Sequence, residues 1–128
     1  MPTWDDYKSE AKSRGALALE LYVVHSTPAA EPEVLKATLP DHLAYQSQLE
    51  ADGKLAFAGP LSDETGKQMQ GMGMIILRAA SFEEARSIAE ADPMHAKRVR
   101  TYTLRKWMIN EGSLTLSVGL SSQVVKLS

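Results

Sequence analysis

The chain has 128 residues, a length that suits a single domain. Apolar residues make up 44% and charged residues 23%, which is typical of a soluble globular protein and excludes a disordered chain. The formal net charge is −2, which gives no positive field to attract nucleic acid or a membrane, and the absence of cysteine excludes disulfides, thiolate nucleophiles and cysteine-bound metals.

The first 15 residues predict a short helix that extends the fold. Thr3 is a suitable N-cap, Asp5 and Asp6 would lie in the first turn, and Gly15 follows the helix. This segment is acidic and polar, unlike a secretory signal, and no apolar run in the chain approaches the ~18 residues of a membrane span. We therefore expect a cytoplasmic protein with neither a membrane nor a nucleic-acid partner.

The first strand and the first core helix are predicted next. Residues 16–25 are rich in Leu, Val and Tyr and predict a strand that stops before the helix- and strand-breaking residues 26–32. A helix of about three to four turns is predicted to begin near Leu39. Pro40 suits its first turn, and Gly53 suits its C-cap.

An antiparallel strand pair and a second helix follow. Residues 54–61 and 71–79 predict the two strands, which a polar loop joins. Ser81 and Glu84 form the pattern of a capping box, and the apolar stripe after them predicts a helix that ends at Pro93.

The C-terminal part of the chain predicts further strands. Residues 99–109 are β-branched and aromatic, and residues 110–112 (NEG) offer a hairpin turn into a tail strand. Residues 113–120 alternate apolar and polar side chains, the period of a half-buried strand, and residues 121–128 predict a turn and a short strand.

The predicted order β-α-β-β-α-β is that of an α+β, ferredoxin-like fold with both helices on one sheet face. We expect a single domain over residues 1–128, with a core of about 16–109, a helical extension at 1–15 and a β extension at 110–128. The predicted strands carry apolar residues on both faces, whereas two helices can cover only one. This imbalance predicts a homodimer, or a higher homo-oligomer, that packs sheet against sheet.

His42 and Asp92 are the candidate pair for chemistry. If the helix begins near Leu39, His42 lies in its first turn, where the positive partial charge of the helix end disfavours imidazolium and keeps the ring neutral. A neutral imidazole can act as a general base. Asp92 ends the second helix, and the proline after it favours an extended backbone that can aim the carboxylate inward. Neighbouring helices would then bring the two side chains together.

Simpler interpretations of the same residues stay open. A lone histidine is more often a surface or core residue, and an aspartate before proline is commonly a turn former. A metal cluster of His25, His42, His95 and Asp92 is chemically possible, but no paired-ligand spacing supports it. A haem- or oxygen-dependent monooxygenase also lacks a ligand motif. We therefore expect neither a metal nor a cofactor.

Three motifs carry a resemblance to a known family: PDHLAY at the helix start, AGPL at a strand end, and EADP at a turn. Over about residues 18–108 the chain resembles the YciI-like family of small dimeric α+β barrel proteins. The resemblance implies a ferredoxin-like subunit that dimerises through its sheet, with His42 and Asp92 as the catalytic pair. It also implies proton-transfer chemistry, such as the dehydrochlorination of a hydroxylated ring.

Four further residues are expected to bind the substrate. Gly59 and Pro60 belong to the AGPL motif, and His25 ends the predicted first strand. Met94 follows the Asp-Pro pair at a position that is often aromatic in the family, so the pocket shape and the substrate can differ.

Two functions are compatible with this reasoning. The first is a small cofactor-independent enzyme that removes a proton from a small substrate, such as an aromatic compound, with elimination or isomerisation as the outcome. The second is a non-catalytic binding or regulatory protein in which the same scaffold holds a small ligand. A closed polar pocket that contains both His42 and Asp92 would favour the enzyme, whereas a separated or exposed pair would favour the binding protein.

Overall fold

The computed structural model describes all 128 residues. They form two compact units, one of residues 20–107 and one that combines residues 1–19 with 108–128. None of the helices has the length and apolar character that a membrane span requires.

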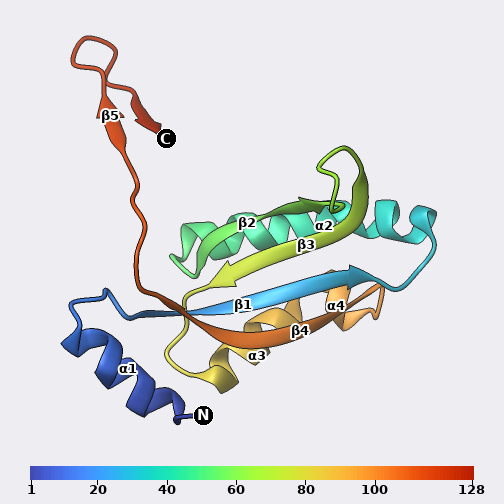
Figure 1. Cartoon of the computed structure of the whole chain (residues 1–128). Helices are drawn as coiled ribbons and strands as arrows, with labels where there is room; N and C mark the ends of the chain where they lie inside the picture. Colours follow the sequence, from blue (N-terminus) through green and yellow to red (C-terminus); the bar gives the residue numbers. More distant parts are fainter. The chain divides into compact units, whose positions relative to one another are not determined.

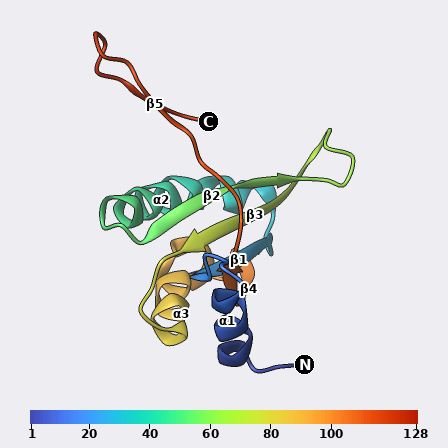
Figure 2. The same ribbon diagram turned by 60° about the vertical axis from the view of Figure 1, so that its left-hand side comes forward.

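The larger unit is built on a four-stranded sheet that carries its helices on one face (Figures 1 and 2). Its strands are β1 (Leu19–Pro28), β2 (Leu55–Ser62), β3 (Met69–Leu77) and β4 (Arg100–Ile109). They lie in the order β2-β3-β1-β4, and β3 runs antiparallel to both β1 and β2. The helices are α2 (Pro32–Ala51), α3 (Phe82–Ala91) and α4 (Pro93–Ala96). This arrangement confirms the predicted α+β, ferredoxin-like fold.

Strand alternation separates a helix-covered face from an open face. Tyr22 and Val24 of β1 pair with Leu77 and Ile75 of β3, and all four side chains are buried. With helix residues they form the core, which consists of Tyr22, Val24, Leu49, Ile75, Leu77, Ala85, Ile88 and Ala89. Residues of the other register face away from the helices. Among these, Phe57 is 51% exposed and Trp107 is 43% exposed.

Helix α2 begins at Pro32, so the prediction of a start near Leu39 is wrong. The chain uses Pro32, and not Pro40, as the proline of the first turn. Pro40 lies inside the helix on its exposed side, where its ring costs the one backbone hydrogen bond that would otherwise reach Lys36. His42 is therefore near the middle of the 20-residue helix, and the argument from the positive helix end does not apply to it.

Other predicted boundaries differ less from those in the structure. β1 continues to Pro28, through residues predicted to interrupt it. The helix start at Ser81 is confirmed, because its Oγ accepts a hydrogen bond from the Glu84 backbone N–H at 3.1 Å. That helix ends at Ala91, and Pro93 starts the short helix α4.

The smaller unit contains α1 (Trp4–Ser13) and a hairpin of β5 (Leu116–Val118) and β6 (Val125–Leu127). The N-cap prediction is confirmed, since Thr3 Oγ1 accepts from the Asp6 backbone N–H at 3.2 Å. The prediction that residues 110–112 turn β4 back onto the tail is wrong. β4 pairs with β1, and the tail strand finds its partner in the last residues of the chain, as the predicted final turn and strand require.

Candidate active site

An open cleft with a volume of about 430 Å³ lies between α2 and the end of the sheet formed by β2 and β3. Most of its lining is apolar or glycine, with leucines from α2 on one wall and methionines from β3 on the other. The polar residues that line it are Ser26, His42, Gln46 and Arg100. A cleft of this size and lining suits a small, largely apolar molecule that carries a few polar groups.

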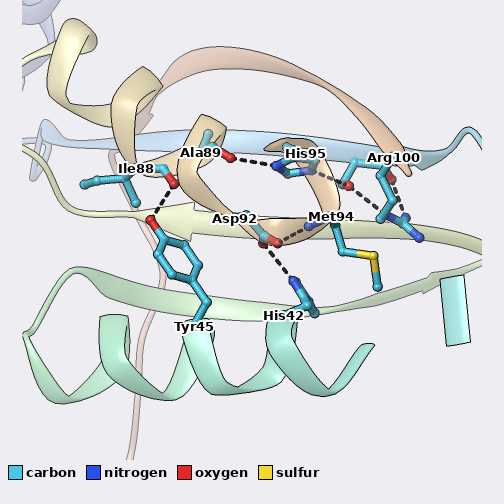
Figure 3. Close-up of polar contacts among 9 residues, drawn as sticks. His42, Tyr45, Ile88, Ala89, Asp92, Met94, His95 and Arg100 are labelled. Atoms are coloured by element: carbon cyan, nitrogen blue, oxygen red, sulfur yellow. Dashed lines mark hydrogen bonds and ion pairs between the residues drawn. The ribbon is translucent and has the colours of Figure 1, made fainter. Parts of the chain in front are cut away.

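His42 lines this cleft and contacts Asp92, the partner that the sequence predicts for it (Figure 3). The distance from His42 Nδ1 to Asp92 Oδ2 is 2.7 Å, and the two side chains are 16% and 3% exposed. An ionised carboxylate only accepts hydrogen bonds, so Nδ1 carries the proton and donates it. The lone pair of Nε2 then has no protein partner, which leaves it available to a bound molecule.

Local sequence explains the aim of the Asp92 carboxylate. Pro93 restricts the residue before it to extended backbone, and Asp92 has φ −59° and ψ 127°. In this conformation Asp92 caps helix α4, because its Oδ1 accepts from the Met94 backbone N–H at 2.9 Å. The other carboxylate oxygen remains free for His42. One dipeptide thus ends α3, starts α4 and orients the acid.

A second network, which the sequence reasoning missed, lies behind the pair. His95 Nδ1 donates to the Ala89 carbonyl at 2.8 Å, and its Nε2 lies 2.8 Å from Ser26 Oγ (Figure 3 shows the His95 ring between its partners). Arg100 Nε donates to the same Ser26 Oγ at 2.8 Å, so this hydroxyl joins the His95 ring to the Arg100 guanidinium. Burial lowers the pKa of His95 and so favours the neutral ring; with its proton on Nδ1, Nε2 accepts from the Ser26 hydroxyl.

A sequence signal for this network did exist. Ser26 continues the register of Tyr22 and Val24, and Arg100 continues that of Tyr102 and Leu104. A polar residue on the buried side of a strand needs a hydrogen-bond partner. The sequence pattern therefore identifies Ser26 and Arg100 as members of a buried polar network.

Tyr45 fixes α2 against α3 above the core. Its hydroxyl donates to the Ile88 carbonyl at 2.7 Å, and burial raises the pKa of this hydroxyl. Tyr45 lies one turn after His42 on the same helix, so this bond helps to hold the His42 side of α2 close to Asp92.

The structure brings some of the remaining candidate residues to the cleft and excludes others. Gly59 and Pro60 line it. Met94 is buried, and its contribution is the backbone N–H that holds Asp92. His25 pairs with Met74 and alternates with the helix-facing Val24, so strand geometry places its side chain on the sheet face away from the helices, and it does not line this cleft. No group of three or more His, Asp or Glu side chains is arranged to hold a metal ion.

Comparison with known proteins extends these observations. Residues 19–108 match the model of the YCII-related domain. The chain is 33% identical over 70 residues to the uncharacterised protein YjpA of Bacillus subtilis (strain 168), which covers 55% of this chain and 75% of that protein. It is similar in structure to 5-chloro-2-hydroxyhydroquinone dehydrochlorinase of Burkholderia phenoliruptrix AC1100, solved with 2,5-dihydroxybenzoquinone. The TM-score is 0.55 at 24% identity, over 68% of this chain and 92% of that one.

Proposed function

The chain belongs to the YCII-related domain family, and we propose that it is a small enzyme in which His42 acts as the general base toward a small, ring-bearing substrate. One observation carries this proposal: the 2.7 Å contact between His42 Nδ1 and the buried Asp92 carboxylate, which leaves Nε2 free at the cleft. The pair is neither separated nor exposed, the two arrangements that would favour a binding protein. The cleft itself is open and mostly apolar, and so differs from the closed polar pocket that would favour the enzyme most.

The proposed chemistry is proton abstraction. Nε2 of His42 takes a proton from a C–H or O–H group of the substrate, and the ring becomes an imidazolium. Asp92 holds Nδ1–H in place and stabilises the positive charge that develops on the ring. A positioned base of this kind contributes about 10²- to 10⁴-fold to a rate. Elimination or isomerisation then follows from the anion that is left on the substrate.

The structural neighbour supports a hydroxylated ring as the first class of substrate to test. That protein is named for removing hydrogen chloride from a chlorinated hydroxyhydroquinone. The mostly apolar lining of the present cleft would accommodate such a ring, and an elimination of this kind begins with the loss of a proton.

Replacement of His42 tests the proposal. A panel of hydroxylated and halogenated ring compounds, including 5-chloro-2-hydroxyhydroquinone, is first screened for thermal stabilisation of the protein. Compounds that bind are then followed by NMR in D₂O for loss of ring C–H signals, and by an electrode for released halide. We expect His42→Asn to abolish either reaction while it preserves the fold, since the Asn amide can still donate to Asp92.

Asp41→Asn is the matched control, because Asp41 is an exposed neighbour on α2 that does not line the cleft. A His42→Asn protein that keeps near-wild-type turnover would remove the mechanism. The other two histidines offer no replacement base at this cleft, since both ring nitrogens of His95 are hydrogen-bonded and His25 lies on the other sheet face. Binding of ring compounds without any turnover would favour the non-catalytic alternative.

We also propose that the open sheet face packs against a second copy of the chain. Its half-exposed Phe57 and Trp107 are large apolar side chains on a face that no helix of the larger unit covers. Burial of such a face between two copies is a common way to complete a sheet fold. Sedimentation at micromolar concentration should give the mass of a dimer or larger oligomer, and a folded single subunit would exclude this assembly.

A further inference from the structure

Arg100 is a half-buried cation on the wall of the cleft. Its Nε donates to Ser26 Oγ, and its Nη2 donates to the Ser26 carbonyl at 2.9 Å and to the Gly71 carbonyl. No side chain or backbone group of the protein accepts from Nη1, which leaves two N–H groups without a partner on a residue that lines the cleft.

The charge of Arg100 also lacks a directly paired carboxylate. No carboxylate forms an ion pair with it, and the cleft lining contains no Asp or Glu. Asp92, whose charge acts on Arg100 from behind the cleft, already binds His42. Burial of the guanidinium lowers the pKa of Arg100 more than the charge of Asp92 raises it. An arginine nevertheless remains charged near neutral pH. A half-buried cation without a directly paired counter-ion is costly, and an anionic ligand would reduce that cost.

We propose that Arg100 binds the negatively charged oxygen of the substrate and thereby selects acidic hydroxylated ring compounds over neutral ones. This inference rests on the proposed function of His42 and deepens it. His42 and Arg100 are the ionisable side chains of the cleft lining, so one wall accepts a proton and the other binds an anion. When the substrate O–H or C–H bond breaks, the proton forms a bond to His42 Nε2, and the electron pair remains on the substrate. Conjugation places that pair on an oxygen, which accepts from Nη1 of Arg100.

The surroundings of Arg100 hold the guanidinium in place before a ligand arrives. Ser26 receives Nε–H, and its own hydroxyl is oriented by His95, which is anchored to Ala89. Gly71 supplies the other carbonyl at φ +80°, where a Cβ would lie 2.9 Å from the Pro28 ring. Glycine is therefore required at this contact. Donors that are fixed in advance stabilise a developing charge without a cost of reorganisation.

A purely structural role for Arg100 makes a different prediction. The contacts to Ser26 and Gly71 tie β1 to the start of β3, and a residue that served only this purpose would affect all ligands of the cleft equally. An anion-binding residue instead discriminates between ligands of equal shape and different charge. Two probes test this difference: 2,5-dihydroxybenzoquinone, which is an acid and is anionic near neutral pH, and 2,5-dimethoxybenzoquinone, which has no acidic proton.

Dissociation constants of both probes are measured by calorimetry for the wild type, Arg100→Gln, Arg100→Lys and Arg86→Gln. We expect Arg100→Gln to weaken binding of the dihydroxy probe by about 10- to 100-fold, which is the usual contribution of hydrogen bonds to a charged group. The affinity for the dimethoxy probe should not change. Arg100→Lys keeps the charge and should rescue part of the loss. Arg86 lies exposed on α3 outside the cleft, so its replacement removes the same charge without effect. Added salt should weaken the dihydroxy probe in the wild type and not in Arg100→Gln.

Three results would overturn the assignment: equal losses for both probes, no loss for either, or a wild-type protein that fails to bind the dihydroxy probe at millimolar concentration. If Arg100→Gln does not fold, the comparison of Arg100→Lys with the wild type decides by the same ratio of probes. The test of Arg100 as an anion-binding residue can be distinguished from the test of His42 as the base. A His42→Asn protein that still discriminates the probes, together with a wild type that turns over no compound, would leave the anion site standing and remove the proposed catalysis.

Discussion

Replacement of Asp92 by Asn separates the orientation of His42 from the stability of the fold. In the wild type the carboxylate accepts from His42 Nδ1–H, so the free nitrogen at the cleft is Nε2 with its lone pair. An Asn side chain of the same shape presents an NH₂ group to one of its two neighbours. Met94 N–H requires the amide oxygen, so the NH₂ group faces His42. Nδ1 must then accept, and the proton of the neutral ring moves to Nε2.

The expected cost to folding is small. Asn caps a helix about as well as Asp, so the bond from the Met94 N–H to the side chain is kept. The contact with His42 changes from a charge-assisted hydrogen bond to a neutral one, a difference of about 1 kcal/mol. The free energy of unfolding should therefore fall by about 1 kcal/mol. Turnover should fall far more, since a base that carries its proton on the wrong nitrogen cannot accept another; in a serine protease triad the equivalent change lowers kcat about 10⁴-fold.

Two measurements check this prediction, and the first needs no substrate. Long-range ¹H–¹⁵N NMR spectra of protein with ¹⁵N-labelled histidine identify which ring nitrogen is protonated. Urea unfolding gives the stability difference, with Asp41→Asn as the control for loss of a surface carboxylate near His42. A wild-type His42 protonated on Nε2, or an Asp92→Asn protein that keeps Nδ1–H, would refute the reasoning about the pair.

Three further predictions concern the fold. Burial lowers the pKa of His95 below its ordinary value of 6.5, so the unfolded state binds a proton more readily than the folded state. The free energy of unfolding should fall as the pH falls through that value, and urea midpoints at about pH 7.5 and pH 5.5 should show a smaller difference for His95→Gln; a wild type that is stabilised by acid would contradict this. Ser81→Ala removes the cap on α3 and should cost about 1 kcal/mol by urea unfolding, whereas Ser87→Ala on the exposed side of the same helix should stay within about 0.5 kcal/mol. The amides of residues 116–118 and 125–127 should exchange with solvent more slowly than in an unfolded peptide, because the tail pairs as a hairpin, and free exchange would show that it does not persist.

The tail shows where the sequence pattern was incomplete. Alternation predicts that one side of residues 113–120 is buried, yet Leu116 is 65% exposed and Val118 is 58% exposed. They pair with Leu127 and Val125, so one side of the hairpin is wholly apolar. A two-stranded hairpin alone is at best marginally stable in water. Alternation identifies which residues prefer burial, but the surface that buries them need not belong to the same chain.

The candidate site was predictable to the extent that it depends on local geometry. The Asp-Pro pair fixes the backbone at Asp92 through a clash between adjacent residues, so the sequence alone shows how that carboxylate is aimed. The Ser26, His95 and Arg100 network depends on contacts between residues about 70 positions apart. Such contacts are set by the strand order and by the short helix α4. This helix has only four residues, too few to show a hydrophobic periodicity in the sequence.

The position of His42 was predictable even though the start of its helix was not. Which face of a helix a residue occupies depends only on its spacing to other residues, and His42 lies three residues before Tyr45 and seven before Leu49, both of which face the core. A helix that begins at Pro32 in place of Leu39 leaves this face unchanged. The electrostatics do change, because a residue in the middle of α2 is too far from the helix end to gain from its partial charge. The competence of His42 as a base therefore depends on its contact with Asp92 and not on the helix. For this reason Asp92→Asn is the variant that tests the proposed mechanism most directly.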